Sequence, residues 1–267
     1  MHATAVIHPG ARLGRGVRIG PYSVVGEHVE LGEGTSVGPH AVLEGWTRIG
    51  KGCEIGVGAL IGAAPQDRKY AGARSWVRIG DRNVIREYVT VHRAADADGA
   101  TVIGDDNYIM AFAHVAHNCA VGSFVTVANA AGLAGHVEIG DHAVIGGMAA
   151  FHQFTRVGAH AIVGGTARVR MDIVPYAMAM GEPLRIYGLN RVGLRRSGFS
   201  AESQATLKAA FRTLFWSGLN VSDAVARLKA EHGGREEVAR LVSFAESSKR
   251  GLTPGIRVGE GADGEEP

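Results

Sequence analysis

The chain has 267 residues, of which 46% are hydrophobic, only 6% are aromatic and 39 are glycine. Its net charge of +2 argues against a general nucleic-acid or membrane-surface binder, so we expect no nucleic acid among its partners. Two cysteines are too few for a disulfide scaffold. The first residues lack the apolar run of a signal peptide, and no window is apolar enough to span a membrane, so we expect a cytoplasmic protein.

Large aliphatic residues recur at every sixth position through most of the chain. A period of six is neither the 2 of a strand nor the 3.6 of a helix, and it is typical of short strands and tight turns wound into a solenoid. Cys53 and Cys119 occupy the small inward positions of this pattern, so we interpret them as core thiols. The aliphatic positions are Ile7, Leu13, Ile19, Val25, Leu31, Val37, Leu43, Ile49, Ile55, Ile61, Ile79, Ile85, Val91, Ile103, Ile109, Val115, Val121, Val127, Leu133, Ile139, Ile145, Phe151, Val157, Val163 and Val169.

This pattern resembles the hexapeptide-repeat family. The resemblance implies a left-handed parallel β-helix with a triangular cross-section, three hexads in each coil, and assembly as a homotrimer. The general preference for right-handed crossovers would have suggested the opposite hand. We therefore expect an all-β solenoid over residues 1–190, followed by α-helices.

Two stretches interrupt the six-residue rhythm, at residues 65–76 and 93–101. Loops that leave a rigid scaffold often carry binding groups, so we expect these insertions to contribute to a site. Residues 151–200 hold seven basic side chains and two acidic ones, which predicts an anionic ligand or an acidic partner for this part of the chain.

After Val169 the rhythm ends and the apolar spacing becomes helical. We predict a helical domain over residues 191–253, with Ser200 and Ser222 as the N-caps of two of its helices. The composition of residues 254–267 predicts a disordered tail.

Histidines gather on coils that the three-hexad period places side by side. Adding 18 to His117 gives Gly135, which is next to His136, and adding 18 again gives Gln153, which is next to His152. Adjacent coils are about 4.8 Å apart, so these residues should share one face. Such clustering among 12 histidines favours a functional site over scattered surface positions.

Three interpretations of this cluster are open. His114, His117 and His136 could hold zinc, as in hexapeptide-repeat proteins that resemble carbonic anhydrases. The column holds no carboxylate, however, and Lys69 in the nearby insertion suits a phosphate better than a metal ion, so we expect no metal. In the second interpretation a histidine base removes a proton from a hydroxyl that attacks a thioester, and a glycine N–H binds the oxyanion. The third is a non-catalytic β-helix scaffold.

The run AHVAHNCAVGSFVTVANAAGLAGHVEIGDHAVIGGMAAFHQF, together with PQDRKY, VTVHR and NRVGLRRSGFS, is similar to the UDP-N-acetylglucosamine 3-O-acyltransferase family. The resemblance covers nearly the whole chain and implies transfer of an (R)-3-hydroxyacyl group from acyl carrier protein to UDP-N-acetylglucosamine, the first step of lipid A synthesis, without a cofactor. It implies His117 as general base and the Gly135 N–H as oxyanion donor. It also implies a set of substrate-binding residues, namely Asp67, Lys69, His92, His114, His136, His152, Gln153, Gly165, Asn190 and Arg196.

Within that set the resemblance implies particular roles. Gly165 matches the position where side-chain bulk limits acyl length, so its lack of a side chain predicts room for a longer chain. Asn190 and Arg196 would reach the uridine diphosphate from a neighbouring subunit. We expect Arg168 and Arg170 to contact the acidic acyl carrier protein.

The chain departs from the family pattern at three positions. Asn118 follows the expected base where an Asp is frequent, so a carboxylate that would support His117 is absent at that position. Val192 stands where a Glu is often found, and Ser197 replaces one Arg of a frequent Arg-Arg pair. The last two departures bear on the nucleotide contacts and not on the chemistry.

Overall fold

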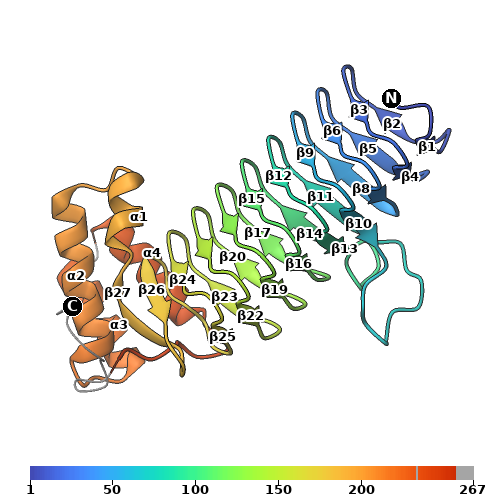
Figure 1. The fold of residues 1–267 in the computed structure, drawn as a ribbon. Coiled ribbons are helices and arrows are strands. Elements are labelled where there is room, and N and C mark those ends of the chain that lie inside the picture. Colours follow the sequence, from blue (N-terminus) through green and yellow to red (C-terminus); the bar gives the residue numbers. More distant parts are fainter. Residues whose placement is uncertain (233, 257–267) are drawn as a thin grey trace.

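Three parallel β-sheets form the faces of one solenoid in the computed structural model, which describes residues 1–232 and 234–256 (Figure 1). The chain adds a short strand to each sheet in turn, so that hydrogen-bonded neighbours are three strands apart in sequence order. We call the three sheets A, B and C. Helices close the C-terminal end of the solenoid.

Sheet A contains β1 (Val6–Ile7), β4 (Val24–Val25), β7 (Val42–Leu43), β10 (Leu60–Ala63), β13 (Thr90–His92), β16 (His114–Val115), β19 (Gly132–Leu133), β22 (Ala150–Phe151) and β25 (Arg168–Val169). Sheet B contains β2 (Arg12–Leu13), β5 (Val29–Leu31), β8 (Trp46–Ile49), β11 (Trp76–Ile79), β14 (Ala100–Ile103), β17 (Ala120–Val121), β20 (Glu138–Ile139) and β23 (Arg156–Val157). Sheet C contains β3 (Arg18–Ile19), β6 (Ser36–Val37), β9 (Glu54–Ile55), β12 (Val84–Ile85), β15 (Tyr108–Ile109), β18 (Thr126–Val127), β21 (Val144–Ile145), β24 (Ile162–Val163), β26 (Ala177–Met180) and β27 (Arg185–Leu189).

One coil takes 18 residues wherever nothing is inserted, as the pairing of Val24 with Val42 shows. The aliphatic residue of each hexad points inward, and Leu43 and Ile61 are fully buried. Ile7, on the first coil, is only partly buried because no coil covers it. The prediction of a left-handed parallel β-helix followed by helices is confirmed.

Each coil turns at three corners, which we name AB, BC and CA after the sheets that they join. Both insertions leave the AB corner, because residues 65–76 connect β10 to β11 and residues 93–101 connect β13 to β14. The first insertion is the long loop that projects from the solenoid in Figure 1. The Arg74 guanidinium of the first insertion donates to Asp98 of the second at 2.5 Å, so the two insertions are joined.

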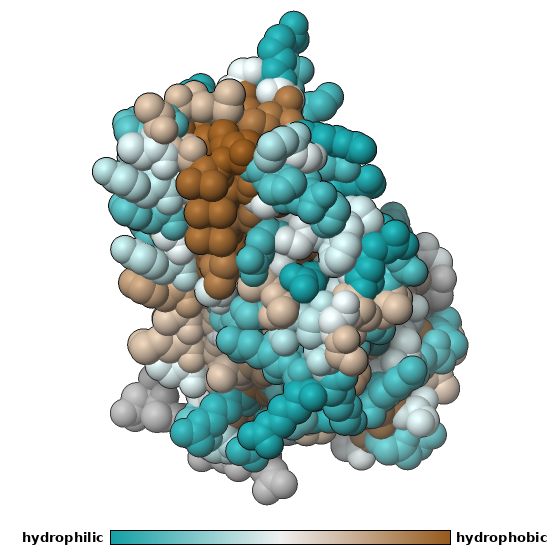
Figure 2. All heavy atoms as spheres, turned by 90° about the vertical axis from the view of Figure 1, so that its right-hand side faces the viewer, coloured by the Kyte–Doolittle hydropathy of each residue, from teal (hydrophilic) through white to brown (hydrophobic). Residues whose placement is uncertain are grey.

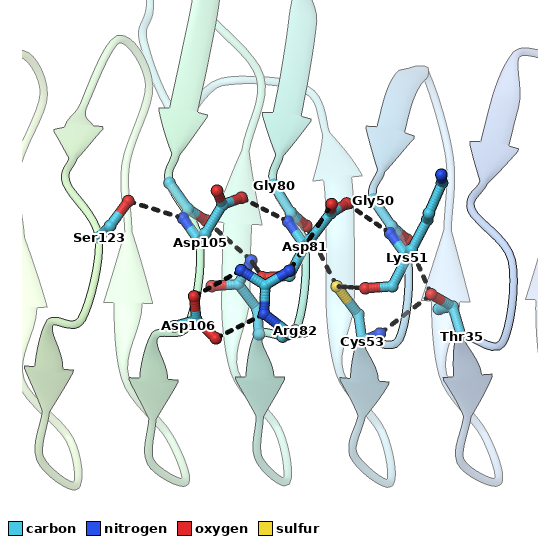
Figure 3. Close-up of polar contacts among 12 residues, drawn as sticks. Thr35, Gly50, Lys51, Cys53, Gly80, Asp81, Arg82, Asp105, Asp106 and Ser123 are labelled. Atoms are coloured by element: carbon cyan, nitrogen blue, oxygen red, sulfur yellow. Dashed lines mark hydrogen bonds and ion pairs between the residues drawn. The ribbon is translucent and has the colours of Figure 1, made fainter.

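The BC corner carries a ladder of side-chain acceptors that runs from coil to coil (Figure 3). The Asp81 carboxylate accepts from the Lys51 N–H at 2.7 Å, and Asp105 accepts from the Asp81 N–H at 2.6 Å. The ladder continues through the Ser123 hydroxyl to Asp141, which accepts from the Ser123 N–H at 2.8 Å. These side chains pair turn N–H groups that the sheets leave without partners, and this stabilises the corner.

A stack of rings lies on the same corner. Phe124 stacks on His142 with ring centroids 4.8 Å apart, and His142 stacks on His160 at 4.6 Å. Tyr176 extends the stack beyond His160 at 6.0 Å. Burial lowers the pKa of His160 to about 4, so this ring is neutral at physiological pH.

Both cysteines lie in the solenoid core, as the hexad positions predict. Burial raises the pKa of Cys53 and raises that of Cys119 to about 12. A buried thiol with a raised pKa is a poor nucleophile, so both residues fill space in the core.

In the described part of the chain, four helices follow the antiparallel β26–β27 pair. Ser200 caps its helix as predicted, since its hydroxyl accepts from the Ser203 N–H. The Ser222 cap is wrong: the helix begins at Val221, and the Asn220 side chain accepts from the Asp223 N–H at 2.9 Å. The helices are α1 (Arg191–Arg196), α2 (Ala201–Trp216), α3 (Val221–His232) and α4 (Glu236–Glu246).

The first three residues of the expected tail pack against the fold. Ile186 donates to the Pro254 carbonyl at 2.9 Å, and the Trp216 indole N–H donates to the Ile256 carbonyl at 2.9 Å. The remainder of the tail for which we predicted disorder, residues 257–267, lies outside the described residues.

Candidate active site

Four histidines from successive coils meet where sheet A turns into the AB corner. His92 ends β13 and His114 lies on the neighbouring β16, with ring centroids 5.2 Å apart. His117 and His136 follow on the corner itself, 5.3 Å apart with perpendicular rings. We call these four residues the histidine cluster.

Gly135 forms the floor beneath His117. A Cβ placed on Gly135 would lie 2.5 Å from His117 Cε1 and 2.6 Å from Nε2, so the imidazole rests against the glycine backbone. Only glycine allows this approach. No hydrogen-bond acceptor in residues 1–232 and 234–256 is paired with the Gly135 N–H, which leaves that donor available to a ligand.

The His117 ring is 6% exposed, and its Nδ1 lies 2.9 Å from the Asn118 side-chain oxygen. An amide oxygen only accepts hydrogen bonds, so Nδ1 carries the proton in this contact. The neutral imidazole then has its lone pair on Nε2, the atom that faces Gly135. This is the arrangement required of a base.

The other members of the cluster are held neutral. Burial lowers the pKa of His92, His114 and His136, and the neighbouring His117 contributes in the same direction. His92 Nδ1 donates to the Ala64 carbonyl at 2.7 Å, which ties the cluster to the start of the first insertion. His114 Nδ1 bonds the Thr90 hydroxyl at 2.7 Å.

The first insertion holds two of the predicted residues beside the cluster. The Asp67 carboxylate accepts from the Lys69 N–H at 2.9 Å, and it lies near enough to His136 to oppose the lowering of its pKa. The Lys69 side chain is exposed. Arg93 anchors the loop, since it donates to the Gly62 carbonyl at 2.8 Å and to the Tyr70 hydroxyl at 3.0 Å.

His152 and Gln153 lie one coil further along the AB corner, and both side chains are exposed. His152 Nδ1 lies 3.1 Å from the Arg250 guanidinium, which also donates to the Arg170 carbonyl at 3.1 Å. Among the described residues, the His152 ring contacts Arg250 and the Gln153 carbonyl and not His117. Arg250 is a residue that the sequence did not single out.

Three predicted residues lie away from the cluster. Gly165 is on the CA corner, at the opposite end of sheet A from Gly135, and a Cβ there would meet only the backbone of Gly147. Asn190 is buried, and its amide accepts from the Gly193 N–H and donates to the His160 carbonyl, so it caps α1. Arg196 is exposed at the end of α1.

Comparison with known proteins identifies the relatives of this chain. Residues 172–253 match the family model described as UDP N-acetylglucosamine O-acyltransferase, domain 2, and residues 28–63 and 100–135 match bacterial transferase hexapeptide repeats. The chain is 52% identical over 259 residues to the acyl-[acyl-carrier-protein]–UDP-N-acetylglucosamine O-acyltransferase of Trichlorobacter lovleyi, with 96% of this chain and 99% of that one covered. It is 48% identical over 253 residues to the enzyme of the same name from Thermodesulfovibrio yellowstonii, with 94% and 98% covered. The chain belongs to the UDP-N-acetylglucosamine O-acyltransferase family.

Solved structures agree with this assignment. The UDP-N-acetylglucosamine acyltransferase of Bacteroides fragilis 9343 superposes with a TM-score of 0.92 at 40% identity, covering 96% of this chain and 100% of that one. As a member of the family the protein is an O-acyltransferase, and the resemblance predicted from the sequence is confirmed.

Asn118 places an amide beside His117, and no carboxylate stands at that position, as the sequence predicts. The amide oxygen lies 2.9 Å from His117 Nδ1, and the amide nitrogen donates to the Asp96 carboxylate at 2.5 Å. The sequence did not point to Asp96, although its place in an insertion beside the cluster could have done so. Val192 is exposed on α1 and Ser197 ends that helix.

The zinc interpretation finds no support in the geometry. Within the described ranges, no group of three or more His, Cys, Asp or Glu side chains is arranged to hold a metal ion.

None of the helices described has the length and apolar character needed to cross a membrane.

Proposed function

We propose that this acyltransferase moves an (R)-3-hydroxyacyl group from acyl carrier protein to the 3-hydroxyl of UDP-N-acetylglucosamine in the cytoplasm, the first step of lipid A synthesis. Relatives that match nearly the whole chain carry both substrates in their names, which supports this choice. The observation that carries the mechanism is the His117 imidazole resting on Gly135, with its proton directed at Asn118.

The chemistry follows from these atoms. His117 Nε2 takes the proton of the sugar hydroxyl as its oxygen attacks the thioester carbonyl. The carbonyl oxygen becomes an oxyanion that the Gly135 N–H stabilises. Collapse of the tetrahedral intermediate breaks the carbon–sulfur bond, and the imidazolium returns its proton to the departing thiolate. The products are the sugar ester and the carrier thiol.

The substrate-binding roles that we propose follow the family resemblance, and the exposure and contacts of several of these residues support them. The exposed ammonium of Lys69, with Asp67 and His92, contacts the sugar and its phosphates next to the base. The neutral rings of His114 and His136 line the sugar and acyl pocket, and His152 and Gln153 extend it by one coil. Arg196 contacts the uridine diphosphate, while the buried Asn190 acts by fixing α1.

A homotrimer, with the site between subunits, accounts for the residues that lie apart in one chain. Sheet A carries in-register apolar side chains on its outer face, and Val6 and Val24 are 63% and 39% exposed. The same column continues through Val42 and Leu60. Figure 2 shows a narrow hydrophobic strip among polar side chains on the N-terminal side of the molecule. A neighbouring subunit packed on this face would bring its own corner toward the histidine cluster.

Basic side chains on and after β25, the last strand of sheet A, form the surface for acyl carrier protein. Arg168 is exposed at the outer end of the sheet, and Arg170 lies beside Arg250 and His152. Opposite charge on the carrier would favour its association with this surface. Gly165 leaves a surface without side chains for the acyl chain.

The test uses purified protein, a panel of (R)-3-hydroxyacyl carrier thioesters, and either UDP-N-acetylglucosamine or its 3-amino analogue as acceptor. Mass spectrometry should detect an acyl ester of UDP-N-acetylglucosamine. His117→Ala should reduce the rate by about 100- to 10,000-fold without changing the melting temperature. His8→Ala, which removes an exposed histidine of the first coil, is the control. Absence of product from the unaltered enzyme, or full activity of His117→Ala, would refute the proposal.

A further inference from the structure

The second insertion is connected to His117, the proposed base, through the side-chain amide of Asn118. The Asp96 carboxylate accepts from Asn118 Nδ2 at 2.5 Å, and Asn118 Oδ1 lies 2.9 Å from His117 Nδ1. The Ala95 N–H donates to the same amide oxygen at 3.0 Å. Carboxylate, amide and imidazole therefore form a continuous chain of hydrogen bonds.

The orientation of the amide follows from its neighbours. An N–H donor at Ala95 requires an oxygen opposite it, and a carboxylate at Asp96 requires an N–H. Both conditions place the amide oxygen of Asn118 toward His117. The flanking residues of the insertion thus determine that the imidazole proton lies on Nδ1, so that Nε2 is the basic atom.

We propose that Asp96 is a positioning residue for acyl transfer, which acts through Asn118 to hold His117 in its reactive tautomer and to stabilise the imidazolium formed during the reaction. This role rests on the proposed function of His117 as base. It restores, by way of an intervening amide, the carboxylate support that is missing at position 118 itself.

The insertion is built to hold this arrangement. The Thr101 hydroxyl accepts from the Asn118 N–H at 2.8 Å, and Asn118 has a φ of +61°, a conformation that asparagine adopts more readily than most residues. A Cβ on Gly99 would lie 2.2 Å from Asp96 Oδ2, so glycine makes room for the carboxylate. Asp98 fastens the same loop to Arg74.

Other ionisable groups face His117 without replacing this support. His92, His114 and His136 lie around it, but an imidazole is either neutral or positively charged and so cannot supply the negative charge of a carboxylate; burial lowers the pKa of all three. Asp96 and Asp67 both interact electrostatically with His136. Asp96 is the carboxylate joined to His117 through hydrogen bonds in the described residues.

The experiment compares Asp96→Asn with the double variant Asp96→Asn/Asn118→Asp and with the control Asp106→Asn, which alters an acid of the BC corner that bonds Arg82. Asp96→Asn should lower kcat by about 10- to 100-fold with little change in KM for UDP-N-acetylglucosamine, as expected when a histidine loses its orienting partner. The acid limb of its pH–rate profile should move to lower pH by about half a unit, because a carboxylate favours the imidazolium. The double variant, which places a carboxylate directly against His117, should recover most of kcat.

Three outcomes would overturn the relay. Asp96→Asn could retain the kcat and pH profile of the unaltered enzyme, Asp106→Asn could lose as much as Asp96→Asn, or the double variant could be no better than the single one. Each of these leaves the unaltered enzyme active and His117→Ala inactive, so failure of the relay is distinguishable from failure of the proposed function.

Discussion

The AB and BC corners of the solenoid repeat with the same period and both carry histidines, yet we propose an active site at only one of them. At the BC corner the acceptor ladder from Asp81 to Asp141 runs from coil to coil without an insertion. At the AB corner the chain leaves the solenoid twice, and the two insertions contribute polar groups beside the histidine cluster. Under the proposed function, this repeated fold carries its active site where the repetition is interrupted.

The histidines of the two corners differ in what lies against them. His160 is stacked between His142 and Tyr176, and its Nδ1 has no hydrogen-bond partner among the described residues. His117 has an amide at Nδ1 and a glycine backbone at Nε2. Stacking leaves His160 a buried neutral ring, whereas the polar partner and the open backbone around His117 suit the base that we propose.

Alanine at a glycine of each corner gives the largest contrast. Gly135→Ala places a Cβ 2.5 Å from His117 Cε1, so the ring must move, and we expect activity to fall by more than about 1000-fold. Gly122→Ala at the BC corner places a Cβ 2.2 Å from Asp141 Oδ1 and should cost about 1–2 kcal/mol of stability with an unchanged kcat. Rate assays and thermal melts would check both, and equal activities of the two variants would contradict the distinction between the corners.

The pH dependence of the protein's stability tests the interpretation of His160 at the BC corner. The pKa of His160 is about 4 in the folded protein against 6.5 for the unperturbed group, so between these pH values the unfolded chain binds a proton that the fold excludes. The contribution of the neutral His160 ring to the free energy of unfolding is complete above pH 6.5 and is lost as the pH falls toward 4. It is on the order of 3 kcal/mol.

His160→Phe keeps a ring in the stack, as Phe124 already does on the same corner, and should make the free energy of unfolding less dependent on pH in this range. Acyl transfer should be unaffected. Denaturant titrations from pH 4 to 7 would measure the slope, with His40→Phe at an exposed corner position as the control. An identical slope in His160→Phe and the unaltered protein would contradict the assignment.

At the third corner we expect an effect on the preferred acyl chain rather than on stability. Gly165→Met adds a side chain to a surface where, among the described residues, only the Gly147 backbone lies near, so it should shorten the preferred acyl chain while retaining transfer of short chains. Competition among carrier thioesters of different length would reveal the shift. An unchanged length profile would remove this surface from the acyl site.

The six-residue period was sufficient to predict the solenoid, its insertions and the inward position of both cysteines, because repeated local geometry needs no long-range information. Short helices and their caps were harder to predict from the sequence. The six residues of α1, which include Gly193, are too few for a helical period, and the cap of α3 moved from Ser222 to Asn220 because the asparagine side chain bonds the Asp223 N–H.

Addition of 18 along the chain placed His117 over Gly135, and this part of the site followed from the sequence alone. The sequence could not place Asp96 against Asn118, because an insertion has no period and its path depends on contacts such as that between Arg74 and Asp98. Nor could the sequence show that the side chain of Asn190 is already paired in hydrogen bonds within the chain. The repeat period determines which residues of neighbouring coils lie over one another. Only the tertiary structure decides which side chain of an irregular loop contacts the solenoid, because that contact joins residues with no fixed spacing in the sequence.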